Sequence, residues 1–231
     1  MAIIQFMSLE SNISGRVAEN LKTLGDALTE FFASVPLSKC WVEYSWSISA
    51  ENAARPLLAG AKIALLESGT SWGLGSNRGA AASLRTFMEN SIGWLYYKDH
   101  PVEYRVMATR EDDLLLPKAT KGYLQRVDRG YEKAYAFLCA AAKRTSEYYY
   151  TDVSQFVHAH PAFASLGTDM ATVTISQPRD KSFLKISASA DEFISDVFST
   201  NYRHNWESMG SPIQENLKLR LGSKLSKFLE I

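Results

Sequence analysis

The chain has 231 residues, of which 46% are apolar and 22% charged, a composition typical of a globular protein with one large domain or two small ones. Twenty-five lysines and arginines balance 25 aspartates and glutamates. This balance excludes a bulk positive field that would attract nucleic acid, although it leaves a local basic groove open.

The first residues, MAIIQFM, have neither the basic region nor the long apolar stretch of a secretory signal. No later apolar run reaches the roughly 18 residues that a membrane-spanning helix needs. The sequence therefore predicts a cytoplasmic protein without membrane contact.

Apolar residues recur at three- and four-residue spacing over residues 11–35, which predicts an amphipathic helix that Pro36 stops. Residues 40–48 alternate apolar and polar side chains and read as a short strand or an extended segment. Residues 50–67 again have helical character. The glycine-rich residues 68–79 predict a loop between helices, because they match neither G-x-x-x-x-G-K-[ST] nor G-x-G-x-x-G.

The strongest helical pattern covers residues 80–98, which present a wide apolar surface. A shorter helix is predicted over residues 102–110, a long one over residues 118–144, and another over residues 147–159, which a proline closes.

Residues 172–176 and 182–187 carry alternating β-branched and apolar side chains on either side of a Pro/Asp turn. This pattern predicts a small β-hairpin near residues 172–187, inserted in a helical body.

Helical periodicity returns over residues 188–206 and 211–229. We therefore expect an all-α fold, a bundle of seven to eight helices with the hairpin insertion, that forms a single helical domain over residues 1–231.

Two helical segments bring chemically useful side chains onto one face. Arg85 and Glu89 are four residues apart on an otherwise apolar helix, and Ser154 and His158 are four apart on another. Either pair is a structural contact, or the four converge in a shared site as candidate catalytic residues. We expect such a site if the two helices pack together.

A second group of candidates is suited to nucleic-acid binding. Arg203 and His204 lie between a tyrosine and a tryptophan, and the hydroxyl of Tyr150 is suited to bind phosphate or carboxylate. The plainer readings are a surface patch and core packing. No metal site and no cofactor is expected, because Cys40 and Cys139 lack C-x-x-C spacing and the four histidines form no H-E-x-x-H pattern.

Two short motifs within residues 76–162 resemble signatures of bacterial helical proteins: Arg85-x-x-x-Glu89, followed by Trp94-Leu95-Tyr96-Tyr97 and Pro101, and Tyr150-x-x-x-Ser154-x-x-Val157-His158. The chain is thereby similar to the abortive-infection and HEPN groups. The resemblance implies an α-helical, usually dimeric protein that is often an antiviral or toxin ribonuclease.

HEPN ribonucleases use an arginine followed by four to six residues and a histidine, without metal. The resemblance implies that His158 moves a proton and that an arginine stabilises the phosphoryl transition state. Thr151, Asp152 and Val153 stand before His158, and no arginine precedes it at that spacing. Arg85 would supply the cation from another helix, and an inactive, binding-only descendant fits equally well.

Two hypotheses follow. The first is a homodimeric protein of phage defence or stress response that binds or cleaves RNA or a nucleotide. The second is a non-catalytic helical protein that oligomerises or docks a partner enzyme. A DNA-binding regulator is disfavoured, because no basic recognition helix is evident.

Overall fold

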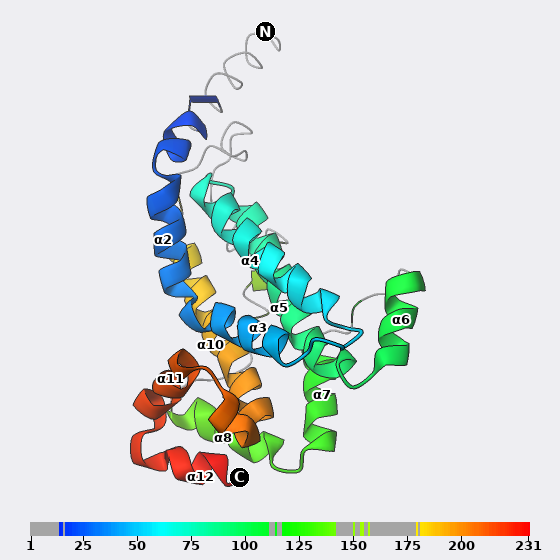
Figure 1. The fold of residues 1–231 in the computed structure, drawn as a ribbon. Coiled ribbons are helices and arrows are strands. Elements are labelled where there is room, and N and C mark those ends of the chain that lie inside the picture. Colours follow the sequence, from blue (N-terminus) through cyan, green and yellow to red (C-terminus); the bar gives the residue numbers. More distant parts are fainter. Residues whose placement is uncertain are drawn as a thin grey trace.

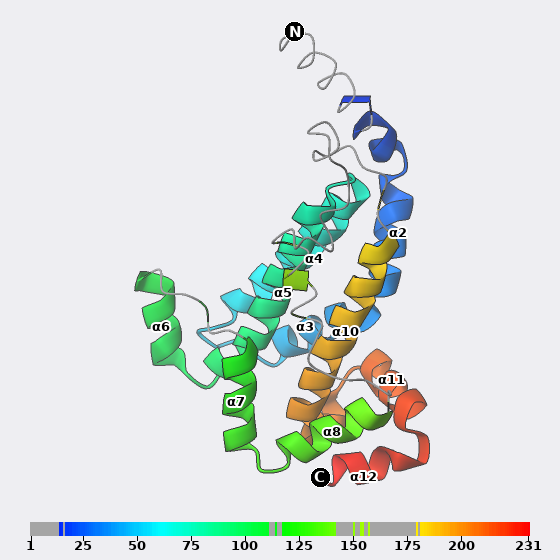
Figure 2. The same cartoon turned by 180° about the vertical axis from the view of Figure 1, so that it is seen from behind.

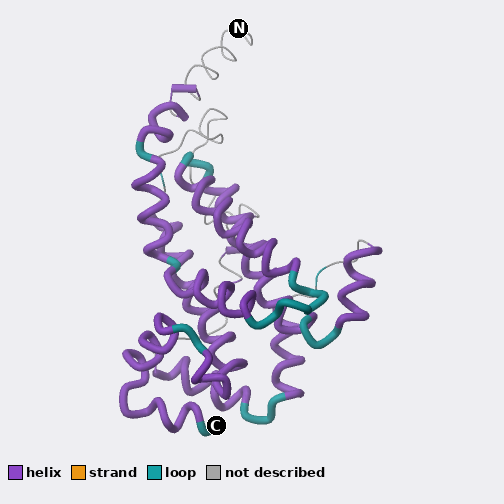
Figure 3. The backbone as a smooth tube through the Cα atoms, in the orientation of Figure 1, coloured by secondary structure: helices purple, strands orange, loops and turns teal. Residues whose placement is uncertain are grey.

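The structure is a computed structural model that describes residues 14–15, 17–110, 114, 117–141, 150, 153–154, 157, 179 and 181–231. Within these residues it contains ten α-helices, two short 3-10 helices and no strand (Figure 3). The elements are α2 (Leu24–Ser34), α3 (Pro36–Ser47), α4 (Pro56–Gly73), α5 (Asn77–Tyr97), α6 (Pro101–Arg110), α7 (Pro117–Val127), α8 (Tyr131–Ala141), α10 (Lys181–Tyr202), η2 (Arg203–Ser208), α11 (Ser211–Leu221), η3 (Gly222–Lys224) and α12 (Leu225–Leu229). The all-α prediction is confirmed, and the count of seven to eight helices is wrong.

The longest helices organise the molecule (Figures 1 and 2). Helices α4 and α5 form an antiparallel pair, in which the Ser68 hydroxyl donates to the Ala80 carbonyl across the pair. Helix α10 has 22 residues, a length of about 33 Å, and contacts α2, α3, α5 and α8. Helix α6 stands off to one side in both views and has no buried residue. No helix in the described part of the chain is long and apolar enough to cross a bilayer.

Aromatic side chains join α10 to the first half of the chain. Phe183 stacks on Phe31 of α2, with ring centroids 6.2 Å apart, and Phe198 lies 5.7 Å from the Trp41 ring of α3. All four rings are buried. Burial of such large side chains contributes the dominant favourable term in folding, so α10 serves as the common packing surface.

The segment predicted as a strand or extended lead-in at residues 40–48 is helical and belongs to α3. Pro36 occupies the first turn of this helix, where its missing N–H is not needed. Leu37, Trp41 and Tyr44 then recur at helical spacing and are buried. The residues that face the core therefore follow the 3.6-residue period of a helix, and the alternation that suggested a strand does not determine the structure.

The prediction of a glycine-rich loop over residues 68–79 is also wrong for most of these residues. Helix α4 continues through Gly73, and only three residues separate it from α5. A Cβ on Gly69 would lie 2.6 Å from Cδ1 of Phe31, and one on Gly73 would lie 2.5 Å from Cδ1 of Leu24. These glycines let the antiparallel helices α2 and α4 approach closely.

Replacement of Gly69 by alanine is expected to lower the free energy of unfolding by about 1–2 kcal/mol, because the added methyl group collides with the buried Phe31 ring. Gly25→Ala is the matched control. Gly25 lies in α2 with no atom within 4 Å of the added Cβ, so its replacement should stabilise the helix by about 0.5–1 kcal/mol. Urea denaturation compares the two variants, and equal stabilisation of both would contradict the close approach of α2 and α4.

The single long helix predicted over residues 118–144 is instead two helices, α7 and α8, separated at residues 128–130. The Asp128 carboxylate accepts a hydrogen bond from the Gly130 amide at 2.9 Å. A Cβ on Gly130 would lie 2.5 Å from the Ile231 carbonyl oxygen and 2.7 Å from Nη2 of Arg203. The bend therefore depends on groups that are distant in sequence.

The predicted β-hairpin is not present in the described residues. Residues 182–187, its second strand, form the start of α10, whereas residues 172–176 lie outside the described part. Phe183, Ser187 and Ala190 are buried at three- and four-residue spacing, so the helical period governs this segment. The predicted helix over residues 211–229 is divided at Gly222, whose φ of +52° ends α11.

A buried carboxylate of α10 caps the start of α3. Asp191 accepts hydrogen bonds from the backbone amides of Leu37 at 3.3 Å and Ser38 at 2.5 Å. The first amides of a helix have no partner within it, and their partial positive charge favours an anion. Burial nevertheless raises the pKa of Asp191 to about 6. The carboxylate thus joins α3 to α10, although its burial has an unfavourable desolvation energy.

Candidate functional site

Helix α5 lies alongside the described residues between 150 and 157, as the sequence analysis required. The Tyr150 hydroxyl donates to Oε1 of Glu89 at 2.5 Å, and Arg78 donates from Nη2 to the Val157 carbonyl at 3.0 Å. Tyr150 contacts Glu89, whereas the later residue Val157 contacts the earlier residue Arg78, so the two segments run antiparallel. Between these contacts Val153 is fully buried and anchors its segment in the core.

Arg85, Glu89 and Tyr150 form a connected cluster on this face. Nε of Arg85 donates to Oε1 of Glu89 at 2.9 Å, and the guanidinium carbon lies 5.5 Å from the centre of the Tyr150 ring. The side chains of Arg85 and Glu89 are 27% and 22% exposed. One carboxylate oxygen therefore receives hydrogen bonds from both partners at the edge of solvent.

The electrostatics of the cluster define its protonation at neutral pH. The hydrogen bond to Glu89 raises the pKa of Arg85, which keeps the guanidinium charged. Burial, reinforced by the hydrogen bond to Glu89, raises the pKa of Tyr150 to about 12, so the phenol stays neutral and remains a donor. The arrangement is a fixed cation and a phenol that both donate to one carboxylate, so the guanidinium is the group of the cluster that attracts an anionic ligand.

The other two predicted catalytic residues are Ser154 and His158. Ser154 is half-buried and lies one helical turn beyond Tyr150. His158 lies outside the described residues. The convergence of its imidazole with Arg85 therefore stays a prediction.

Arg203, predicted to bind nucleic acid, is an interior residue that is 1% exposed. Its terminal nitrogens donate to both carboxylate oxygens of Asp128, Nη1 to Oδ2 at 2.5 Å and Nη2 to Oδ1 at 2.9 Å. Nη1 also donates to the Thr200 carbonyl at 2.7 Å. The guanidinium is thus directed into the protein, while the next residue, His204, is exposed on η2. We place Arg203 outside the proposed site.

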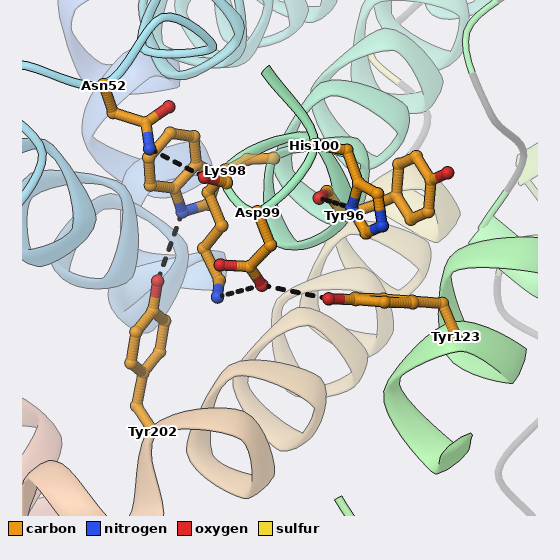
Figure 4. Close-up of polar contacts among 8 residues, drawn as sticks. Asn52, Tyr96, Lys98, Asp99, His100, Tyr123 and Tyr202 are labelled. Carbon is orange, nitrogen blue, oxygen red and sulfur yellow. Dashed lines mark hydrogen bonds and ion pairs between the residues drawn. The ribbon is translucent and has the colours of Figure 1, made fainter. Parts of the chain in front are cut away.

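A second polar cluster, at the C-terminal end of α5, was missed by the sequence analysis (Figure 4). The His100 ring stacks on Tyr96 with centroids 3.9 Å apart and meets the edge of Tyr123 at 4.7 Å. Oδ2 of Asp99 accepts hydrogen bonds from Lys98 at 2.7 Å and Tyr123 at 3.2 Å. The only signal in the sequence was the four-residue spacing of Tyr96 and His100.

The hydrogen bond of His100 identifies its tautomer. Nδ1 lies 2.8 Å from the Tyr96 carbonyl oxygen, which only accepts, so Nδ1 carries the proton and Nε2 keeps its lone pair when the ring is neutral. Burial and the neighbouring Asp99 carboxylate raise the pKa of Tyr123 to about 12. Stacking and hydrogen bonding join the end of α5 to α7, which is a structural role.

Among the described residues, no group of three or more histidine, cysteine, aspartate or glutamate side chains is arranged to hold a metal ion. No protein-family model, curated protein or solved structure matches this chain. The resemblance to the HEPN groups therefore rests on its motif residues alone.

Proposed function

We propose that this chain is a HEPN-like helical protein that binds RNA or a nucleotide and cleaves RNA without metal, in phage defence or a related stress response. The observation that supports the proposal is the pair of hydrogen bonds to Glu89, which joins Arg85 and Tyr150 from distant segments on one partly exposed face. A charged guanidinium in this position is suited to a phosphate group. We further propose a cytoplasmic location and a homodimer.

Each residue has a proposed role. Arg85 binds the phosphate and stabilises the charge that develops on it, while Glu89 holds the guanidinium in place. His158 acts as the acid–base group for the 2′-hydroxyl or the leaving oxygen, with Ser154 beside it. Tyr150 orients Glu89 through its hydroxyl group.

Arg85→Ala and His158→Ala are each expected to lower the rate of cleavage of single-stranded RNA by at least about 100-fold. The melting temperature should hardly change, because a partly exposed ion pair contributes little to stability. A gel assay with labelled RNA measures the rates, in the presence of a metal chelator. Arg105→Ala is the control, since it removes an exposed arginine from α6.

The outcomes separate the proposal from its rival. Wild-type activity in both variants would contradict the assigned roles. Absence of cleavage by the wild-type protein, together with loss of folding in Arg85→Ala, would favour the second hypothesis, a non-catalytic protein that oligomerises or docks a partner enzyme. Helix α6 favours that rival, because it has no buried residue and its Val102 is 60% exposed. Sedimentation and a pull-down then identify the assembly.

A further inference from the structure

A groove lies where α2, α3 and α4 meet, and its lining includes none of Arg85, Glu89 and Tyr150. It has a volume of about 580 Å³. The buried side chains of its lining are Val35, Val42, Leu65 and Phe87, the last contributed by α5. Ligand sites of small molecules usually have volumes of about 300–1,000 Å³ and mostly apolar walls, so the groove has the size and lining of such a site.

Three more apolar side chains line the groove: Leu28 and Phe32 come from α2, and Leu66 comes from α4. Leu66 is 53% exposed, so a large apolar side chain of the lining is in contact with solvent. Thr29, a polar residue of the lining, donates its hydroxyl group to the Gly25 carbonyl of its own helix at 3.0 Å.

The charged side chains of the lining come from α3 and the first half of α4. They are Lys39, Lys62 and Glu43. Lys39 and Glu43 lie 3.9 Å apart and are 65% and 52% exposed, a weak pair in water. Two cations thus stand against one anion, which leaves a net positive charge. The Nζ atom of Lys62 lies 4.9 Å from the centre of the Trp46 ring.

A mostly apolar groove with two lysines and one glutamate in its lining fits an apolar ligand with one anionic headgroup. We propose that this groove binds a fatty carboxylate, with the alkyl chain along α2 and α4 and the carboxylate beside Lys39 and Lys62. An amphipathic helix is the alternative occupant, and the experiment below distinguishes it from the fatty carboxylate.

Dodecanoate is the probe, titrated into the full-length protein by calorimetry below its micelle concentration. Saturable binding is expected, and Leu66→Asp should weaken it by about tenfold or more, because a charge replaces the apolar wall. Ile63→Asp is the matched control. Ile63 is 58% exposed on the same helix but does not line the groove, so its replacement should leave affinity unchanged.

The headgroup is tested with Lys39→Gln and Lys62→Gln, alone and combined. These changes should weaken binding of dodecanoate but not of dodecanol, which has no charge. Lys181→Gln, which removes an 82% exposed lysine of α10, should change neither. Circular dichroism verifies that each variant is folded.

Three results would overturn the inference: no saturable binding of dodecanoate by the folded wild-type protein, equal losses in Leu66→Asp and Ile63→Asp, or saturable binding only of an acidic amphipathic peptide. The inference does not depend on the proposed function, since RNA cleavage should be unchanged in Leu66→Asp.

Discussion

Replacement of Asp128 by asparagine is expected to lower the free energy of unfolding by about 3–5 kcal/mol, because it leaves a buried arginine without its counter-charge. Arg203 is 1% exposed, and both oxygens of the Asp128 carboxylate accept its hydrogen bonds. The same carboxylate accepts the Gly130 amide at the bend between α7 and α8. One substitution therefore weakens the junction of α8, α10 and the C-terminal residues. Urea denaturation measures the loss.

Two comparisons test the mechanism of this loss. Glu43→Gln breaks an exposed ion pair with Lys39 and should change stability by less than about 1 kcal/mol. Arg203→Met, added to Asp128→Asn, should recover part of the loss by removing the unpaired charge. A small effect of Asp128→Asn, similar to that of Glu43→Gln, would contradict a structural role for the buried pair.

The Asp128 contribution also depends on pH. The hydrogen bond from Arg203 lowers the pKa of Asp128 below its ordinary value of 3.8. A depressed pKa means that the stabilisation is present above pH 3.8 and is lost as the pH falls further. The acid-induced loss of stability should therefore be smaller in Asp128→Asn than in the wild-type protein.

Asp191 should have the opposite pH dependence, in a higher window. Burial raises its pKa from 3.8 to about 6, so the folded protein binds the proton more tightly than the unfolded chain does. This contribution to stability falls as the pH rises from 3.8 to about 6. The stability advantage of the wild-type protein over Asp191→Asn should therefore shrink by about 2–3 kcal/mol between about pH 4 and pH 7.

Urea denaturation of both proteins across this pH range measures that difference. Asp26→Asn, at an exposed position in the first turn of α2, is the control for the chemical change itself. A wild-type advantage over Asp191→Asn that stays constant with pH would contradict the assignment. Above about pH 6 the variant should also be less stable than the wild-type protein, because an amide nitrogen cannot accept the hydrogen bond that a carboxylate oxygen accepts from the Leu37 or Ser38 amide.

Several helices could be predicted from sequence because their determinants are local. The predicted helix over residues 80–98 corresponds to α5 within a few residues, and that over residues 102–110 corresponds to α6. In both, the helical pattern lies within the segment itself, and Pro101 marks the boundary between the two segments. The Arg85–Glu89 pair was predictable for the same reason, since residues four apart share a helix face.

Other features required partners from elsewhere in the chain. In the sequence, Gly69 and Gly73 are typical of a loop. In the structure they belong to α4, and α2 packs against them. The bend at residues 128–130 depends on Arg203 and on the C-terminal Ile231. A sequence pattern identifies a glycine or an aspartate but not the side chain that approaches it from a distant segment.

From the sequence alone it was determined that the chain is helical and that Arg85 and Glu89 face the same way, because periodicity and i to i+4 spacing are properties of short segments. Only the tertiary structure decided which ionisable groups are available to a ligand. The fold places the Tyr150 hydroxyl in hydrogen-bonding contact with Glu89, and it buries Arg203 in an ion pair with Asp128. The physical reason is that desolvation and ion pairing depend on the neighbours that folding brings together, and those neighbours lie 61 and 75 residues apart along the chain.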